Sequence, residues 1–166
     1  MVSTLPPAPR APPSAVPAEL ALAESIHGLM RAVLHRVQPT LERERLSMGR
    51  FWTLHLVSSL PEPTVSTVAR HLSVRNPSAC TTVDGLVGAG LVRRQRSEKD
   101  RRVVELVPTA EGRRAEAAVW RAIGAALRSA TAPLPPEDVR TTARTLAVVA
   151  GSLGDVSARS ARGRGA

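Results

Sequence analysis

Basic side chains are concentrated in the middle of the chain, in a pattern that suits binding to phosphate groups. Residues 70–102 contain eight basic and three acidic residues, a difference of +5, which is over half of the formal net charge of +9. The eight are Arg70, Arg75, Arg93, Arg94, Arg96, Lys99, Arg101 and Arg102. Guanidinium groups bind phosphate oxygens through paired hydrogen bonds. We therefore expect a polyanionic partner, with nucleic acid first and an anionic membrane surface second.

The chain lacks the short motifs that mark common catalytic and metal sites. It has no Gly-x-Ser-x-Gly, no glycine-rich phosphate loop and no His-Glu-x-x-His. The four histidines are His27, His35, His55 and His71. No two of them are four residues apart, as a helical metal site needs, and a zinc site completed by Glu24 is only a weak alternative. We therefore expect no enzyme activity, no metal and no cofactor.

A helix is expected between Asn76 and Gly90. Asn76 is a suitable N-cap, Pro77 fits the first turn, and Gly90 fits the left-handed position that follows a helix. Spacings of three and four predict one apolar, inward face made of Ala79, Cys80, Val83, Leu86 and Val87. Short side chains on the opposite face suit close approach to a DNA major groove: Ser78, Thr81, Thr82 and Gly85.

Cys80 is the single cysteine of the chain, so an intrachain disulfide is excluded. Its place on the inward face of the expected helix predicts a buried structural thiol. A redox switch is the alternative, which would need an accessible thiolate.

Two β-prone segments follow this helix, with a charged tip between them. "LVRRQR" and "VVELVP" are rich in valine and leucine, whereas "SEKDRR" is polar. The pattern predicts a hairpin from whose tip Lys99, Arg101 and Arg102 can reach phosphates or a minor groove. Asp100 can hold an arginine through a charge-assisted hydrogen bond. A merely solvated tip is the alternative, and the neighbouring helix pattern favours DNA binding.

Further helices are expected on both sides of this central region. The first starts at Ala18, and Pro39 should end or kink it. Ser47 and Thr64 are suitable N-caps for two short helices. After the hairpin, a helix of about six turns should start at Thr109. The last should start at Pro135 or Pro136, followed by two acidic residues that favour a helix N-terminus.

Both ends of the chain are expected to be disordered. Residues 1–17 contain six prolines and little apolar surface. Residues 155–166 carry Arg159, Arg162 and Arg164 among small residues, and extra phosphate contacts are an alternative role for them. With no signal peptide and no run of 18 apolar residues, we expect a soluble, cytoplasmic protein that does not enter a membrane.

Two motifs make this sequence resemble a known family. In "GLVRRQRSEKDRRVVELVPTAEG", Asp100 and Arg102 form an Asp-x-Arg pattern, and Thr109 and Gly112 form a Thr-x-x-Gly pattern. The preceding "STVARHLSVRNPSACTTVDGLVGAGLV" reads as helix, turn and helix. Together they resemble the MarR family of winged helix-turn-helix transcriptional regulators, over about residues 20–153. Pro108 departs from the family pattern, in which an apolar residue usually precedes the threonine.

The resemblance implies a mainly α fold with a small β-hairpin wing. A winged helix-turn-helix core at about 47–108 would be flanked by dimerisation helices at about 18–45, 109–132 and 136–154, all within a domain spanning 18–154. The apolar stripes of the outer helices also need a partner, which a second copy would supply in a two-fold homodimer.

The expected function is sequence-specific binding to double-stranded DNA, with repression at a pseudo-palindromic operator. DNA contacts are expected from Arg75, Asn76, Ser78, Thr81, Thr82, Arg96, Lys99, Asp100, Arg101 and Arg102. Family members bind aromatic acids or drugs in a cleft, which would here be lined by Met30, Trp52, His55 and Trp120; the same four residues also suit an ordinary core. Two alternatives stay open: a ligand-independent architectural DNA-binding protein, and a winged-helix module that binds proteins.

Overall fold

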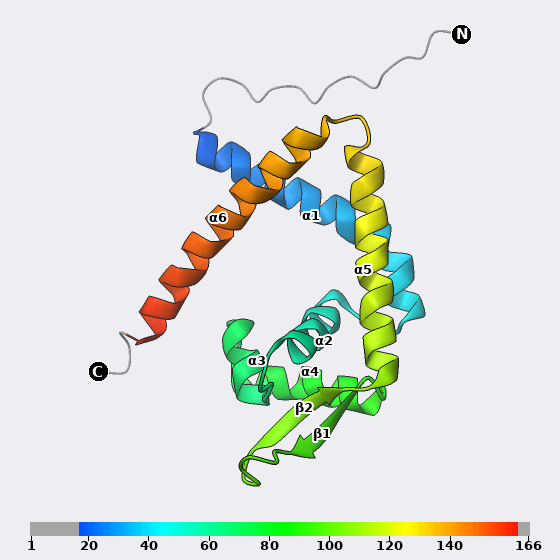
Figure 1. Cartoon of the computed structure of the whole chain (residues 1–166), viewed down its shortest axis with the longest axis vertical. Coiled ribbons are helices and arrows are strands. Elements are labelled where there is room, and N and C mark those ends of the chain that lie inside the picture. Colours follow the sequence, from blue (N-terminus) through cyan, green and yellow to red (C-terminus); the bar gives the residue numbers. More distant parts are fainter. Residues whose placement is uncertain (1–16, 163–166) are drawn as a thin grey trace. The chain divides into compact units, whose positions relative to one another are not determined.

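The computed structural model describes residues 17–162, with side chains described up to residue 153. Apart from Pro17, the expected tail at 1–17 lies outside the described residues, as do residues 163–166. The described elements are six helices and one antiparallel hairpin, as expected (Figure 1): α1 (Ala18–Arg43), α2 (Met48–Ser59), α3 (Val65–His71), α4 (Asn76–Gly88), β1 (Val92–Arg96), β2 (Val104–Pro108), α5 (Ala110–Thr131) and α6 (Pro136–Arg162). The described residues form two compact units, divided between Ile123 and Gly124.

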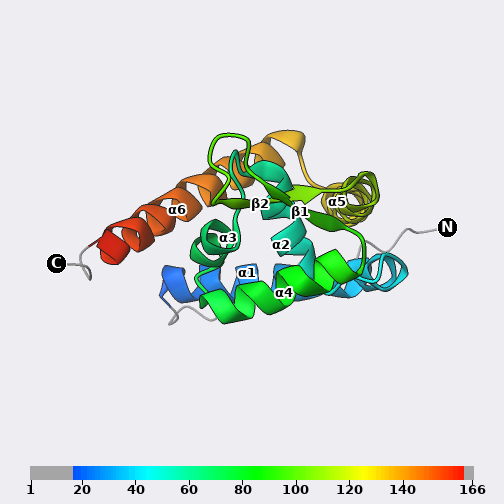
Figure 2. The same cartoon turned by 90° about the horizontal axis from the view of Figure 1, so that it is seen from below.

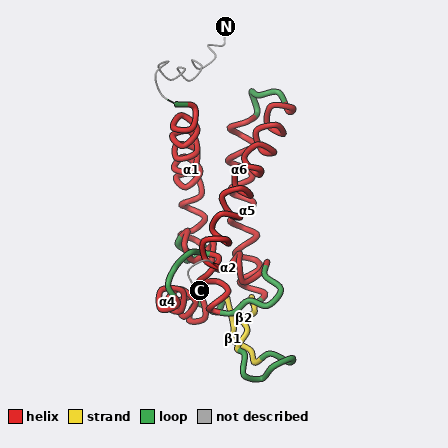
Figure 3. Tube along the Cα trace, turned by 90° about the vertical axis from the view of Figure 1, so that its left-hand side faces the viewer, coloured by secondary structure: helices red, strands yellow, loops and turns green. Residues whose placement is uncertain are grey.

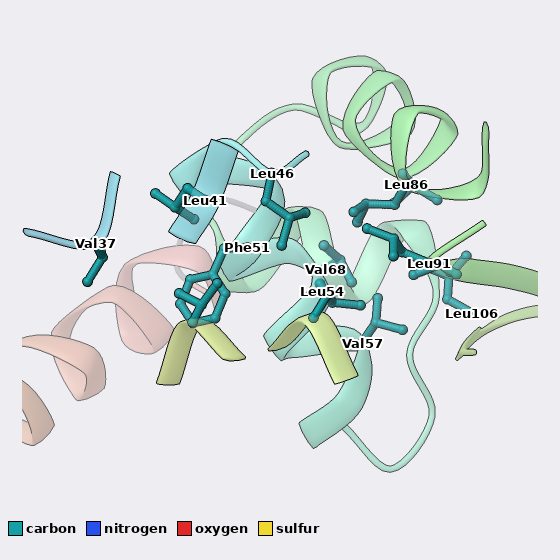
Figure 4. Packing of buried hydrophobic residues seen from close by; sticks show 14 residues of the cluster. Val37, Leu41, Leu46, Phe51, Leu54, Val57, Val68, Leu86, Leu91 and Leu106 are labelled. Carbon is teal, nitrogen blue, oxygen red and sulfur yellow. The ribbon is translucent and has the colours of Figure 1, made fainter. Parts of the chain in front are cut away.

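The first unit has one hydrophobic core centred on α2. Phe51, Leu54 and Val57 recur every three residues along this helix and are almost fully buried. Figure 4 shows them among side chains from α1, α3, α4 and the hairpin. The buried members of the core are Val37, Leu41, Leu46, Phe51, Leu54, Val57, Val68, Val83, Leu86, Leu91, Val92, Leu106, Ala115 and Val119. This core fixes α4 and the hairpin relative to each other.

Local caps set the limits of α2 and α3 where the sequence predicts them. The Ser47 hydroxyl accepts a hydrogen bond from the Arg50 amide. Thr64 and Thr67 form a reciprocal capping box at the start of α3. Both N-caps are therefore confirmed.

The turn between α3 and α4 is tighter than expected. Ser73 adopts a left-handed φ of 54°, and the Val74 amide donates to the Ala69 carbonyl to close α3. Only Arg75 then remains before α4, so Arg75 occupies the N-cap and Asn76 is the first helical residue. The prediction that Asn76 caps the helix is wrong for this reason. Gly90 has φ 71°, which confirms the predicted left-handed residue after α4.

The hairpin pairs Val92 with Pro108 and Arg96 with Val104. Pro108 is the last residue of its strand, where the missing amide proton costs little. On the outer edge of β2, the Leu106 amide donates to the Pro63 carbonyl at 2.7 Å, which ties the hairpin to the α2–α3 loop. The tip extends beyond the helices of this unit (Figure 3).

Thr109 and Gly112 join the hairpin to α5. The Thr109 hydroxyl donates to the Gly90 carbonyl at 2.7 Å and accepts from the Gly112 amide at 3.0 Å. A Cβ at position 112 would lie only 2.1 Å from the Leu91 carbonyl oxygen. The Thr-x-x-Gly pattern thus has a physical basis: the threonine caps α5, and the glycine lets α5 approach the start of the hairpin.

Of the two effects expected of Pro39, an end of the helix is wrong. α1 continues through Pro39 to Arg43, because Val37 and Leu41 on either side of the proline are buried and hold the helix against the core. α6 extends to Arg162, so the expected disorder from Asp155 onward does not hold as far as that residue. The segment 155–162 contains neither proline nor glycine, and its alanines and arginines favour helix.

Candidate nucleic-acid interface

α4 lies at one edge of the first unit, with α2 and α3 beside it (Figure 2). Asn76, Ser78 and Thr81 are exposed, as a DNA-contacting face requires. Thr82 is half-buried, and a Cβ at Gly85 would lie 2.6 Å from Arg50 Nη2. Of the four residues expected on the recognition face, Gly85 thus lies against Arg50 of α2, and Thr82 is partly covered.

An open cleft of about 390 Å³ separates the start of α2 from α4. Its α2 wall includes Arg50 and Trp52, and its α4 wall includes Ser78, Thr81 and Thr82. The Thr81 and Thr82 hydroxyls donate to carbonyls one turn earlier in α4, at 3.0 and 3.1 Å. Their oxygens can still accept hydrogen bonds. Groups on α4 are thus shared between its exposed edge and a cleft.

An ion pair joins α4 to the hairpin. Arg94 Nη2 donates to Asp84 Oδ1 at 2.7 Å, and this hydrogen bond lowers the pKa of the Asp84 carboxyl. The Cys80 thiol donates weakly to Asp84 Oδ2, at 3.6 Å. Cys80 is only partly buried, whereas a buried structural thiol was expected. Its position in the helix places it at the border of the core, beside Asp84.

Asp100 shapes the tip of the hairpin. Its Oδ1 accepts from the backbone amide of Arg102 at 2.9 Å, and its carbonyl accepts from the Val103 amide. We expected Asp100 to hold an arginine side chain; in the structure it holds an arginine main chain instead, because the tight turn brings that amide to it. The Arg102 side chain is left exposed and projects from an ordered turn.

Lys99 has a partner that the sequence does not reveal. Its Nζ lies 2.7 Å from Glu62 Oε1, in the loop between α2 and α3. This hydrogen bond lowers the pKa of Glu62 and raises that of Lys99. The sequence shows only that the "PEP" segment, which contains Glu62, follows α2. Nothing in it predicts a contact between this segment and the hairpin. Lys99 is thus less available to DNA than expected.

Four predicted cations remain without an acidic partner. Arg75, Arg96, Arg101 and Arg102 are exposed, and no carboxylate within residues 17–153 forms an ion pair with them. Arg75 is at the start of α4 and the other three are on the hairpin. We call these four residues the arginine surface. Unpaired guanidinium groups beside a helix-turn-helix suit contacts to DNA phosphates.

The aromatic residues of the chain gather in one place. Phe51, Trp52 and His55 on α2 meet Trp120 on α5, with ring centroids 5.1 to 6.4 Å apart. We call these four residues the aromatic cluster. It unites three of the four predicted effector residues. Met30 is exposed on α1 and is not among the core residues.

Glu116 contacts the aromatic cluster through His55, although no sequence motif singles it out. Its Oε1 lies 2.8 Å from His55 Nδ1, and the Glu116 side chain is 13% exposed. The Ser59 hydroxyl lies 3.5 Å from the same nitrogen. A catalytic triad needs its serine and its carboxylate on opposite ring nitrogens, so this group is no triad.

No group of three or more His, Cys, Asp or Glu side chains within the described part of the chain is arranged to hold a metal ion. None of the described helices combines the length and apolar composition needed to cross a membrane.

A sequence model of the MarR family matches residues 46–104, which contain α2, α3, α4 and β1. The transcriptional repressor CouR, bound to a 23-mer DNA duplex, is 26% identical with a TM-score of 0.65, over 80% of this chain and 92% of that one. CouR from Rhodococcus jostii RHA1 bound to p-coumaroyl-CoA gives a TM-score of 0.63 over the same shares of both chains.

Two other solved structures share the fold at lower identity. A MarR family protein from Bacillus stearothermophilus is 18% identical with a TM-score of 0.72, over 82% of this chain and 95% of that one. Streptococcus pneumoniae FabT in complex with DNA is 24% identical with a TM-score of 0.68, over 83% and 99% of the two chains. The comparison with curated proteins gave no match.

Proposed function

Because the chain belongs to the MarR family of DNA-binding winged helix-turn-helix transcriptional regulators, we propose that it represses transcription as a homodimer on a pseudo-palindromic operator. Members of this family are regulators rather than enzymes. CouR is a repressor bound to a DNA duplex, and we carry that activity over to this chain. Since the target is chromosomal DNA, we place the protein in the cytoplasm.

The arginine surface is the observation that carries this proposal. Arg75 flanks the exposed start of α4, where Asn76, Ser78 and Thr81 can meet base edges in a major groove. Arg101 and Arg102 project from a turn that Asp100 holds in shape, so the wing offers them to phosphates or a minor groove without first breaking an ion pair. Affinity would come mainly from phosphate neutralisation, and sequence preference from α4.

Exposed apolar residues on α1 support the homodimer. Leu22, Ile26, Leu29 and Met30 recur along one side of this helix and are all exposed in the single chain. A contiguous apolar stripe of this kind marks a protein-binding surface. A second copy is the simplest partner, and its two-fold axis would present two copies of α4 about one helical turn of DNA, or roughly 10 base pairs, apart.

The aromatic cluster is the place we propose for a small-molecule effector. Solved relatives hold such molecules: CouR binds p-coumaroyl-CoA, and Staphylococcus aureus MarR binds salicylate and kanamycin. In this chain Trp52 belongs to the aromatic cluster and also lines the cleft beside α4. A molecule that moves Trp52 would therefore act on α4, and so favour dimers in which the two recognition helices no longer fit the operator.

Binding of the purified protein to the intergenic DNA beside its own gene tests the proposal. We expect saturation at one dimer per site and clear preference over a random duplex of equal length, measured at two salt concentrations. Arg101→Ala combined with Arg102→Ala should weaken binding and lower the slope of log affinity against log salt by about 3.6, since the homodimer loses four phosphate contacts and each contributes about 0.9. Arg121→Ala, which removes an exposed charge from α5, should leave the slope unchanged.

Other outcomes separate the two alternatives. Equal and strongly salt-dependent binding to both duplexes would favour an architectural DNA-binding protein. Binding to neither duplex at low salt would favour a winged-helix module that binds proteins. An unchanged salt slope in the double arginine variant would show that Arg101 and Arg102 of the wing do not contact DNA phosphates.

A further inference from the structure

The aromatic cluster combines open indole rings with a nearly buried carboxylate. Trp52 and Trp120 are 41% and 39% exposed, and their ring centroids are 5.8 Å apart, edge to face. No Lys or Arg within residues 17–153 makes a cation–π contact with either ring. The exposed part of each indole is thus available to a positive charge from outside.

The polar groups of this site meet at His55. Trp120 Nε1 donates to His55 Nδ1 at 3.4 Å, and Glu116 Oε1 lies 2.8 Å from the same nitrogen. The Glu116 carboxylate can only accept hydrogen bonds when it is ionised. Its second oxygen is therefore left to accept from a donor outside this group.

The cations closest to Glu116 along α5 are engaged elsewhere. Arg113 donates to the Pro108 carbonyl at 2.8 Å. Arg114 bonds Glu111 at 2.6 Å and lies 3.4 Å from Glu44. Within the described side chains, only His55 forms an ion pair with Glu116. A carboxylate that is 13% exposed and has no Arg or Lys partner disfavours an anionic ligand and favours a cationic one.

We propose that the aromatic cluster binds organic cations, namely protonated amines or quaternary ammonium compounds with an aromatic body. The positive group lies against the indole rings and near Glu116, and the aromatic body packs on Trp52 and Trp120. Cation–π attraction and charge complementarity both select this class. The inference specifies the effector site of the proposed function and rests on it for its regulatory meaning, whereas binding itself does not depend on DNA.

A pair of small probes with similar bodies and opposite charges tests the proposal. Benzyltrimethylammonium and phenylacetate both carry one phenyl ring. Because Trp52 and Trp120 are the two tryptophans of the chain and both belong to the aromatic cluster, intrinsic fluorescence reports on this site. We expect the cation to change tryptophan emission with an affinity at least tenfold higher than that of phenylacetate, at neutral pH and fixed ionic strength.

Glu116→Gln should reduce affinity for the cation at least tenfold, while its emission spectrum without ligand and its circular dichroism stay those of the parent. Glu111→Gln is the matched control, since it removes one carboxylate from the same helix, and it should leave cation affinity unchanged. Trp120→Phe should weaken cation binding several-fold and keep the fold, because phenyl rings attract cations less than indoles.

Tighter binding of phenylacetate, equal binding of the two probes, no binding of either, or full cation affinity in Glu116→Gln would each overturn the proposal. The DNA assay described above is run on the same samples. If the parent protein does not bind DNA, the proposed function is contradicted. The proposal of a cation site is then decided by the probe measurements alone. If the protein binds its operator and the cation releases the protein from the DNA, both proposals are supported.

Discussion

Gly112 is needed for the space around it rather than for its backbone angles. A methyl group at this position would lie 2.1 Å from the Leu91 carbonyl oxygen, which is backbone and cannot move aside easily. Gly112→Ala should therefore lower the free energy of unfolding by about 1–3 kcal/mol, the usual range for overpacking. Urea denaturation followed by circular dichroism measures it.

Gly124→Ala is the control for that experiment. It lies on the same helix, and the nearest atom to its added Cβ would be the flexible end of Arg128, at 3.2 Å. This change should stabilise the protein by about 0.5–1 kcal/mol, as alanine favours helix over glycine. If both changes destabilise the protein, α5 does not tolerate an added methyl group at either position. The contact with the Leu91 carbonyl would then not explain the effect of Gly112→Ala.

At Ser73, in contrast to Gly112, it is the backbone conformation that would favour glycine. Ser73 adopts φ 54° in the turn between α3 and α4, a conformation that costs a non-glycine residue about 1–2 kcal/mol. Glycine removes this strain but adds about 0.4–1 kcal/mol of unfolded-state entropy, so Ser73→Gly should stabilise the protein by about 1 kcal/mol. Ser66→Gly, an exposed helical position, should destabilise it by about 0.5 kcal/mol. A fall in melting temperature for both variants would contradict this account of the turn.

At the scale of elements, two ion pairs connect the wing to the helix-turn-helix. Arg94 binds Asp84 on α4, and Lys99 binds Glu62 in the α2–α3 loop. Both partners of the second pair are well exposed, so the pair adds little stability, yet it removes one cation from the DNA-binding surface. Glu62→Gln should free Lys99 and tighten DNA binding a few-fold at low salt, as measured by fluorescence anisotropy.

A double-mutant cycle gives the control for that prediction. In a Lys99→Ala background, Glu62→Gln should have no further effect apart from a small general gain in positive charge. An equal gain in both backgrounds would mean that Glu62 acts on DNA directly. The pair also has a predictable pH response: the hydrogen bond lowers the Glu62 pKa, so its contribution is complete at neutral pH and is lost as the pH falls through that lowered value.

At the scale of the whole molecule, the oligomeric state tests whether the exposed apolar stripe on α1 forms a dimer interface. Leu29→Glu places a charge in the stripe and should shift the dimer to monomer at micromolar concentration in analytical ultracentrifugation. DNA affinity should fall as well, since two recognition helices would no longer bind together. His35→Glu introduces the same charge on the opposite side of α1 and should leave the dimer intact. A monomeric parent protein would contradict the homodimer outright.

Residues whose partners lie nearby in the chain could be predicted from the sequence. The caps at Ser47 and Thr64, the left-handed Gly90 and the two hairpin strands follow from interactions within a few residues. Errors arose where burial decides the outcome. Pro39 stays inside α1 because its buried neighbours hold the helix, and Gly85 is covered by Arg50 from another helix.

Fold class, the order of helices and hairpin, and the basic character of the wing are thus determined by the sequence itself, since they depend on local propensity, periodicity and charge. Which cations remain free is decided only by tertiary structure. Asp84 pairs with Arg94, Glu62 pairs with Lys99, and Glu116 meets His55 across 61 positions of the chain. The charge pattern of the sequence cannot reveal such pairs. A carboxylate interacts with the charged groups that the folded chain brings within a few ångströms of it, and these can be distant in sequence.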